Sequence, residues 1–296
     1  MTRLEIGLGL QSDKRPAEYV EIARRAEAAG VDVFTVFHDL YYQPAIAPLL
    51  LIAEGTERIR VGPAALNPWT LHPAEIAGQI AALDLVSDGR ALLGLANGAW
   101  LDQLGLEQRR PVERMREAVE VVRRLLTGDR SGFDGAHFRL VPGAGLEYEP
   151  RRRRVPLMLG TWRPKMAALA AEVADEVKIG GSANPDMVRQ MREWLGNDGV
   201  GVVVGAVTVV DRDGDRARAL AREKVAMYLE VVAGLDPTLE PGREPPLERF
   251  AIAGTPAEVV AHVEELADAG LHRVEFGDPV LGLDLLLDEV VPALRR

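Results

Sequence analysis

Residues 4–37, LEIGLGLQSDKRPAEYVEIARRAEAAGVDVFTVF, contain one complete strand–helix–strand unit. The runs 4–10 and 33–37 are short and mostly apolar, which is typical of buried strands. The segment between them begins near Pro16 and stops at Gly30. Proline suits the first turn of a helix, and glycine suits the left-handed residue that ends one. Two strands joined through a helix predict a parallel pair, because a parallel connection needs a long crossover.

Six more runs of the same kind follow, with helical patterns between them: residues 59–65, 91–95, 155–160, 176–180, 202–210 and 273–276. Residues 112–126 place apolar side chains at three- and four-residue steps, and residues 255–269 open with a capping box at Thr255 and Glu258. Strand–helix alternation repeated eight times predicts a (β/α)8 TIM barrel, one domain spanning residues 1–296 with short insertions near 97–110, 128–150 and 234–250. A doubly wound sheet is disfavoured, because Ser12 stands where the dinucleotide-binding pattern needs its third glycine.

The composition excludes several classes of function. A net charge of −10, from 45 acidic and 35 basic side chains, disfavours nucleic acid and anionic membranes as partners. The one basic cluster, residues 151–154, precedes the fifth strand and therefore lies at the end of the barrel away from the active site, where we interpret it as a solvated loop. The histidines lack metal-ligand spacing, so no metal is expected. With no cysteine, no signal peptide and no membrane span, we expect a cytoplasmic protein.

The active sites of TIM barrels lie at the C-terminal ends of the strands. His38-Asp39 directly follows the second strand and joins a near-neutral acid–base group to a carboxylate. The alternative is that His38 caps the next helix; the two interpretations are balanced, and the position favours catalysis. We expect four side chains on loops of this face to contact substrate: Gln11, Tyr41, Trp69 and Trp100.

The same face offers a phosphate site. Thr161-Trp162-Arg163-Pro164 opens a helix after the fifth strand, where free backbone N–H groups and Arg163 can bind an anion. The alternative is an ordinary helix start with an exposed arginine. Asn97-Gly98 and Gly180-Gly181-Ser182 allow close backbone approach by a ligand. Together these loops indicate a bulky phosphorylated cofactor.

The order of the motifs resembles a known family. Residues 59–73 (IRVGPAALNPWTLHP) resemble the third-strand signature of the luciferase-like superfamily, and residues 87–95 (SDGRALLGL) resemble its fourth-strand element. Further similar segments cover nearly the whole chain in order: residues 112–118, 125–128, 155–157, 164–166 and 250–256. Within the superfamily the chain is most similar to the branch that uses the deazaflavin coenzyme F420, especially the methylenetetrahydromethanopterin reductases.

The resemblance implies an F420-dependent oxidoreductase that transfers a hydride between the deazaflavin and an organic substrate. It also implies a bulge at Ala64-Ala65-Leu66, often with a non-prolyl cis peptide, behind the deazaflavin ring. The loops after strands four and five are then expected to hold the cofactor: Asn97, Gly98, Gly160, Thr161, Trp162 and Arg163. The alternatives are an FMN-dependent luciferase-like monooxygenase and a barrel that only binds a ligand.

The resemblance also implies a homodimer, in keeping with residues 44–54 (PAIAPLLLIAE), which are hydrophobic nearly all round. Burial of this helix under an insertion is the alternative.

Four departures from the reductase pattern concern the substrate. Gly9 and Ala99 stand where the reductases carry a glutamate and an aspartate, and Leu71 stands where an arginine is common. His38-Asp39 reverses the usual order of these two residues. With the strand-one carboxylate missing, His38 is our first candidate for the proton donor and Asp39 the second, and methylenetetrahydromethanopterin is not expected to be the substrate.

Overall fold

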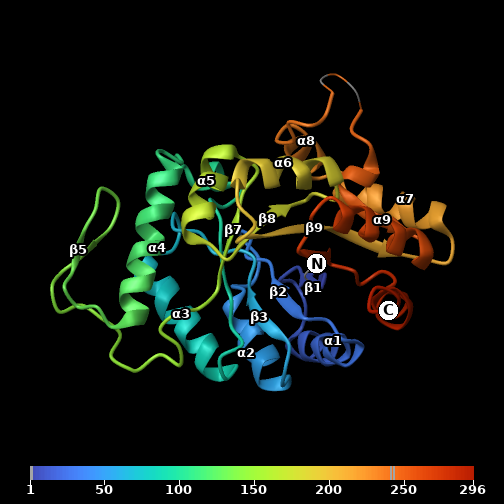
Figure 1. The fold of residues 1–296 in the computed structure, drawn as a ribbon. Coiled ribbons are helices and arrows are strands. Elements are labelled where there is room, and N and C mark those ends of the chain that lie inside the picture. The colour runs from blue at the N-terminus through green and yellow to red at the C-terminus, as the bar shows by residue number, and fades with distance from the viewer. Residues whose placement is uncertain (1–2, 241, 243) are drawn as a thin grey trace.

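The computed structural model describes residues 3–240, 242 and 244–296, and it confirms the predicted TIM barrel (Figure 1). Eight parallel strands follow one another around the barrel in the order β3-β2-β1-β11-β9-β8-β7-β4. Their bounds are β1 (Glu5–Leu10), β2 (Val33–Val36), β3 (Arg60–Pro63), β4 (Leu93–Leu95), β7 (Leu157–Gly160), β8 (Glu176–Gly180), β9 (Gly201–Val210) and β11 (Arg273–Gly277). Isolated bridges between Val61 and Ala91 and between Leu66 and Leu95 join β3 to β4 and close the ring.

Helices surround the strands and bury an apolar face against them (Figure 1). They are α1 (Pro16–Ala29), α2 (Ile46–Gly55), α3 (Pro73–Val86), α4 (Pro111–Thr127), α5 (Pro164–Val173), α6 (Pro185–Leu195), α7 (Gly214–Val225) and α9 (Pro256–Asp268), followed by the short α10 (Leu283–Leu285) and α11 (Val291–Ala293). The predicted ends are confirmed: Gly30 closes α1 at φ 92°, and the Thr255 hydroxyl accepts the backbone N–H of Glu258 at the start of α9. Among the described residues, no helix is both long and apolar enough to cross a membrane.

The three insertions fall where the sequence predicts them. The first carries a 3-10 turn (Leu101–Leu104), and the second forms the hairpin β5 (Phe133–Asp134) and β6 (Arg139–Leu140), which projects beyond α4 (Figure 1). The Glu117 carboxylate of α4 accepts three backbone N–H groups of this hairpin and ties it to the barrel. The third insertion contains a second 3-10 turn (Leu247–Arg249), and the short helix α8 (Leu229–Ala233) directly precedes this insertion.

One strand was not predicted. β10 (Ala251–Gly254) pairs in parallel with the last four residues of β9, from Val207 to Val210. β9 is ten residues long, and its first part already pairs with β8 and β11. Its far end would otherwise leave unpaired backbone groups, and β10 satisfies them.

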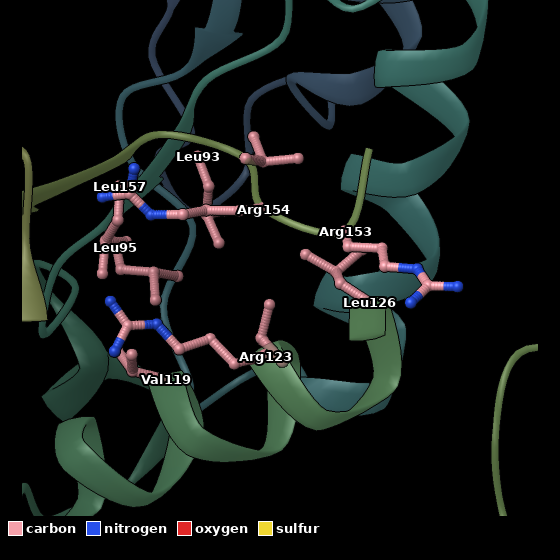
Figure 2. A pocket seen from close by; sticks show the side chains of 10 residues that line it. Leu93, Leu95, Val119, Arg123, Leu126, Arg153, Arg154 and Leu157 are labelled. Atoms are coloured by element: carbon pink, nitrogen blue, oxygen red, sulfur yellow. The ribbon is translucent and has the colours of Figure 1, made fainter. Parts of the chain in front are cut away.

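The basic cluster precedes β7 as predicted, and three of its four arginines are exposed, whereas Arg152 is half-buried. The Arg152 guanidinium binds the carboxylate of Asp84, whose side chain is only 1% exposed, and Arg154 pairs with Asp175. Figure 2 shows the small cavity at this end, lined by leucines with Arg153 and Arg154 at its rim. Its volume of about 30 Å³ admits a few water molecules and no cofactor.

Candidate active site

His38 lies just beyond β2 and is tied to the start of α2. Its Nδ1 accepts the backbone N–H of Ala45 at 3.2 Å, so the predicted capping role is confirmed for that nitrogen. A nitrogen that accepts a hydrogen bond carries no proton, which leaves the proton of the neutral ring on Nε2. Burial lowers the pKa of His38, although the neighbouring Asp39 opposes the effect. The ring is therefore held neutral, with Nε2–H as a hydrogen-bond donor.

Asp39 is partly buried beside His38, and the side-chain amide of Gln11 donates to its Oδ2 at 3.2 Å. Burial raises the pKa of Asp39, while Gln11, His38 and Lys178 partly counteract the rise. A carboxyl group with a raised pKa keeps its proton to higher pH, as a general acid requires. Burial therefore shifts the two pKa values in opposite directions, raising that of Asp39 and lowering that of His38.

Gln11 is fixed on its other side by the loop after β11. Its backbone N–H donates to Asp278 Oδ1 at 3.4 Å, and Lys14 Nζ binds the same oxygen at 2.7 Å. Asp278 has a φ of 42°, in the left-handed region. The loops after β1, β2 and β11 therefore meet around Asp39. The Gln11 side-chain amide donates its hydrogen bond to the carboxyl group of Asp39.

The predicted bulge follows β3, and its Ala64–Ala65 peptide bond is cis, as the family resemblance implies. The backbone N–H of Ala64 donates to Val36 O at 2.8 Å, and that of Leu66 donates to Gly94 O at 3.0 Å. Ala64 and Ala65 are half-buried, whereas Leu66 is 1% exposed. Only the two alanines therefore offer side chains to a ligand, and Leu66 packs into the core.

The loop after β4 has features that fit a polar ligand. Asn97 Oδ1 and Trp69 Nε1 are buried without a protein partner among the described residues. Gly98 has a φ of 82°, and a Cβ there would lie 3.0 Å from Asn67 Cγ. A buried polar atom normally finds a hydrogen-bond partner, so these two atoms are suited to a bound molecule. The residues present thus fit a bulky polar cofactor such as F420.

The loops after β7 and β8 carry the residues predicted to bind phosphate. Arg163 is exposed and precedes α5, and its backbone N–H donates to Thr161 Oγ1 at 3.0 Å. Trp162 is buried, and its Nε1 donates to Gly180 O at 2.9 Å, so it joins the two loops to each other. Gly181 has a φ of 79°, a conformation that glycine adopts without strain. Of the predicted phosphate contacts, Arg163 is the freest to bind an anion.

The predicted substrate residues separate into two groups. The Trp69 ring lies 4.5 Å from the guanidinium of Arg114, which stacks on Phe138 at 4.7 Å as well. Tyr41 is 76% exposed and Trp100 38% exposed, both with left-handed backbones. Trp69 is therefore held rigidly, while Tyr41 and Trp100 stand at the surface.

The interior of the barrel is charged, which was not predicted from the sequence. Lys178 of β8 binds Glu275 of β11, and one layer below, Arg273 binds Glu176. A Cβ at Gly9 would lie 2.9 Å from Glu275 Oε1, so the glycine leaves the room that this carboxylate uses. The signal was present in EVKIG (176–180) and RVEFG (273–277), where charged residues alternate with apolar ones.

Within the described part of the chain, two groups of histidine and carboxylates lie close enough to hold a metal ion: Glu5, Glu176 and His272, and Glu113, Glu117 and His137. Protein groups already occupy these carboxylates. Glu176 binds Arg273, and Glu117 accepts backbone N–H groups of the β5–β6 hairpin. The absence of a metal stays a prediction.

Comparison with known proteins agrees with this geometry. The profile of the luciferase-like monooxygenase family matches residues 1–273. The chain belongs to this family. As a luciferase-like protein, it is 29% identical to the 5,10-methylenetetrahydromethanopterin reductase of Archaeoglobus fulgidus, with 99% of this chain and 100% of the relative covered. It is 27% identical to the F420-dependent glucose-6-phosphate dehydrogenase of Amycolatopsis mediterranei, with 95% of each covered.

Solved structures share the whole fold. The coenzyme F420-dependent tetrahydromethanopterin reductase of Methanopyrus kandleri superposes with a TM-score of 0.87 at 25% identity, over 99% of this luciferase-like chain and 100% of the reductase. An F420-dependent secondary alcohol dehydrogenase, solved with an F420–acetone adduct, gives a TM-score of 0.80 at 21% identity, over 100% of each chain. The second likeness concerns the fold alone.

Proposed function

We propose that this luciferase-like protein is an F420-dependent oxidoreductase acting on a small organic substrate. The observation that carries the proposal is the similarity along the full chain to two kinds of F420 enzyme, a reductase and a sugar-phosphate dehydrogenase. What these relatives share is the cofactor, and where they differ is the substrate. The buried, unpartnered Asn97 Oδ1 and the free Arg163 support the same conclusion.

At the C-terminal end of the barrel, different residues are assigned to cofactor binding and to proton transfer. When bound, F420 supplies or accepts the hydride. We infer that the backbone of the Ala64–Ala65 bulge and the loop at Asn97 orient the cofactor, and that Arg163 binds its phosphate. Asp39 holds the proton that accompanies the hydride, and His38 donates a hydrogen bond from Nε2. Gln11 fixes the Asp39 carboxyl group by the bond described above.

We propose that methylenetetrahydromethanopterin is not the substrate. Gly9 and Ala99 lack the carboxylates that the resemblance places in the pterin reductases. At Gly9 an added Cβ would lie 2.7 Å from Phe37 Cε1, so Phe37 would have to move to admit such a side chain. We infer that the acceptor is a different compound.

We also propose a homodimer. α2 exposes Leu51 at 44%, and the adjacent α3 exposes Leu85 at 54% and Val86 at 40%. The predicted alternative was that an insertion buries α2. Leu51 is exposed, so none of the described insertions covers this side chain. These side chains supply an apolar surface that a second copy can bury. A cytoplasmic location stays a prediction.

An anaerobic hydride-transfer assay tests the proposed function. The protein is mixed with chemically reduced F420 and a panel of ketones, enones and imines, and the return of oxidised cofactor is followed by absorbance. We expect enzyme-dependent oxidation with at least one acceptor and none with the pterin. In a separate aerobic assay, enzyme-dependent formation of an oxygenated product with reduced FMN, and no turnover with F420, would instead support the monooxygenase alternative.

A further inference from the structure

The Lys178–Glu275 pair is placed as part of the active site. Lys178 lies two residues before the end of β8, and its side chain points into the barrel, with Nζ 5.2 Å from the centre of the Phe37 ring. Phe37 immediately follows β2 and precedes His38. A Cβ at Gly205 would lie 2.7 Å from Lys178 Cε. The ammonium group therefore stands in the uppermost interior layer, directly under the loop that carries Asp39.

Of this ion pair, the Lys178 side chain is the partner exposed toward the C-terminal end of the barrel. The Lys178 side chain is 10% exposed, whereas Glu275 and Arg273 below it are 0% exposed. The inner cluster of Val33, Leu92 and Met158 is also buried. With the interior closed beneath it, the exposed part of Lys178 faces the loops at the C-terminal ends of the strands. The charge of Lys178 also acts on Asp39, which places the two groups in one electrostatic environment.

Burying an ion pair in this position costs desolvation free energy, and we take its presence as a sign of function. TIM-barrel interiors are ordinarily filled by branched aliphatic side chains, and desolvating two charges can outweigh their attraction. Gly9 and Gly205 both leave room for this pair where larger residues would not fit. At the top of the barrel, a cation therefore occupies a position that apolar side chains usually fill.

Lysines are scarce in this chain, and their positions agree with this view. Of 35 lysines and arginines, four are lysines: Lys14, Lys165, Lys178 and Lys224. Lys14 follows β1, Lys165 lies in the first turn of α5, and Lys224 reaches Asp278 after β11. All four thus gather at the C-terminal ends of the strands. A compact ammonium, unlike the broad guanidinium fork, can act as a point charge on a single oxygen atom.

We propose that Lys178 is a catalytic residue that stabilises negative charge on a substrate oxygen, and that the substrate is a carbonyl compound, a ketone or conjugated enone, or the corresponding alcohol. This proposal rests on the proposed function. Bound reduced F420 would supply the hydride and its electron pair to the carbonyl carbon, or to the β-carbon of an enone. The π electrons of the C=O bond move to oxygen, which becomes anionic beside Lys178. A proton from Asp39 completes the reduced product, so substrate is reduced and cofactor oxidised by two electrons.

A phenol whose absorption spectrum changes on ionisation can detect the Lys178 ammonium group by binding alone, with no reaction needed. We would add 4-nitrophenol to the protein, with and without F420, and record the spectrum of the bound probe. A nearby ammonium favours the phenolate, so we expect it to bind at least tenfold more tightly than the neutral phenol. The test variant is Lys178→Met/Glu275→Gln, which removes both charges together. The matched control is Glu176→Gln/Arg273→Met, which removes the buried pair one layer below.

We expect the test variant to lose the phenolate preference and the control to keep it, with circular dichroism showing that both are folded. If wild type shows no such preference, or if the test variant retains it, the assignment of Lys178 is wrong. Because this measurement also works on the cofactor-free protein, it decides the proposal even if F420 does not bind.

Kinetics provide the second measurement. With reduced F420 and 2-cyclohexenone or cyclohexanone, kcat of the test variant should fall by about 10²–10³-fold, the usual effect of losing one oxyanion donor. Its affinity for F420 should match that of the control. Wild-type protein that binds F420 but reduces neither probe contradicts the carbonyl substrate class. Failure to bind F420 in every variant contradicts the proposed function instead.

Discussion

Two adjacent titratable side chains at the end of β2 have different environments. His38 uses Nδ1 to accept a backbone N–H, and its pKa is lowered by burial. Asp39 accepts one side-chain amide, and burial raises its pKa. In an active site, opposite pKa shifts in neighbouring groups often distinguish the general acid from the hydrogen-bond donor. Both residues follow β2, as the sequence predicted, and the choice between them as proton donor depends on contacts that only the fold creates.

Replacing Asp39 tests the proton assignment. Asp39→Asn keeps the shape and removes the acid, so we expect turnover to fall by about 10²–10⁴-fold with F420 affinity unchanged. In wild type, reduction should slow as the pH rises through the raised pKa of Asp39, because the protonated carboxyl group is lost. The measurement is a pH–rate profile in the direction of substrate reduction. An Asp39→Asn variant with full activity would remove Asp39 from the mechanism.

The neighbouring His38→Ala substitution should also lower turnover, by removing the Nε2–H donor. It also removes the acceptor for Ala45 N–H, a loss of about 1 kcal/mol for a helix cap. His38→Asn, whose side-chain oxygen can accept that N–H, should recover stability in urea denaturation without recovering turnover. Recovery of both would mean that His38 acts only as a cap.

Arg163 is the test of phosphate binding. Arg163→Ala should weaken F420 binding by about 1.5–3 kcal/mol, the value of a hydrogen bond to a charged group, which is roughly a 10- to 150-fold rise in Kd. Fluorescence titration measures it. Arg153→Ala, an equally exposed arginine at the opposite end of the barrel, is the control and should leave Kd unchanged. Equal affinities in the two variants would contradict the assignment.

At the level of elements, periodicity was sufficient for the eight barrel strands and most helices. It could not predict β10, because residues 251–254 form a strand only where the long β9 offers an edge. It also could not place the charged interior. In residues 176–180 and 273–277 the charged side chains alternate with apolar ones, a pattern also typical of a strand with one solvated face. Closing the sheet into a barrel turns that face inward.

The link between α3 and the segment before β7 gives a prediction of stability. Arg152 is the partner of Asp84, so Arg152→Leu leaves a buried carboxylate unpaired. Because the Arg152 side chain is 33% exposed, we expect the lower end of the usual range, a loss of about 3 kcal/mol in the free energy of unfolding. Urea denaturation measures the loss. Arg153→Leu, beside it in the chain, should cost much less, and equal losses would show that the Asp84 pair has no special role.

For the whole molecule, the exposed apolar side chains of α2 and α3 predict an assembly. Light scattering after gel filtration should give a dimer at micromolar concentration. Leu51→Glu/Leu85→Glu should shift it to a monomer, because charges would be buried in the interface. Val141→Glu, an exposed residue of the second insertion, is the control and should leave the dimer intact. A monomeric wild type would contradict the proposed homodimer.

The choice of cofactor determines the chemistry of the whole molecule, and a paired titration distinguishes F420 from FMN. Purified protein freed of cofactor is titrated with F420 and, separately, with FMN, and binding is followed by the change in fluorescence. We expect saturable binding of F420 at one site per chain, at least tenfold tighter than that of FMN. Tight binding of FMN with no binding of F420 would contradict this expectation.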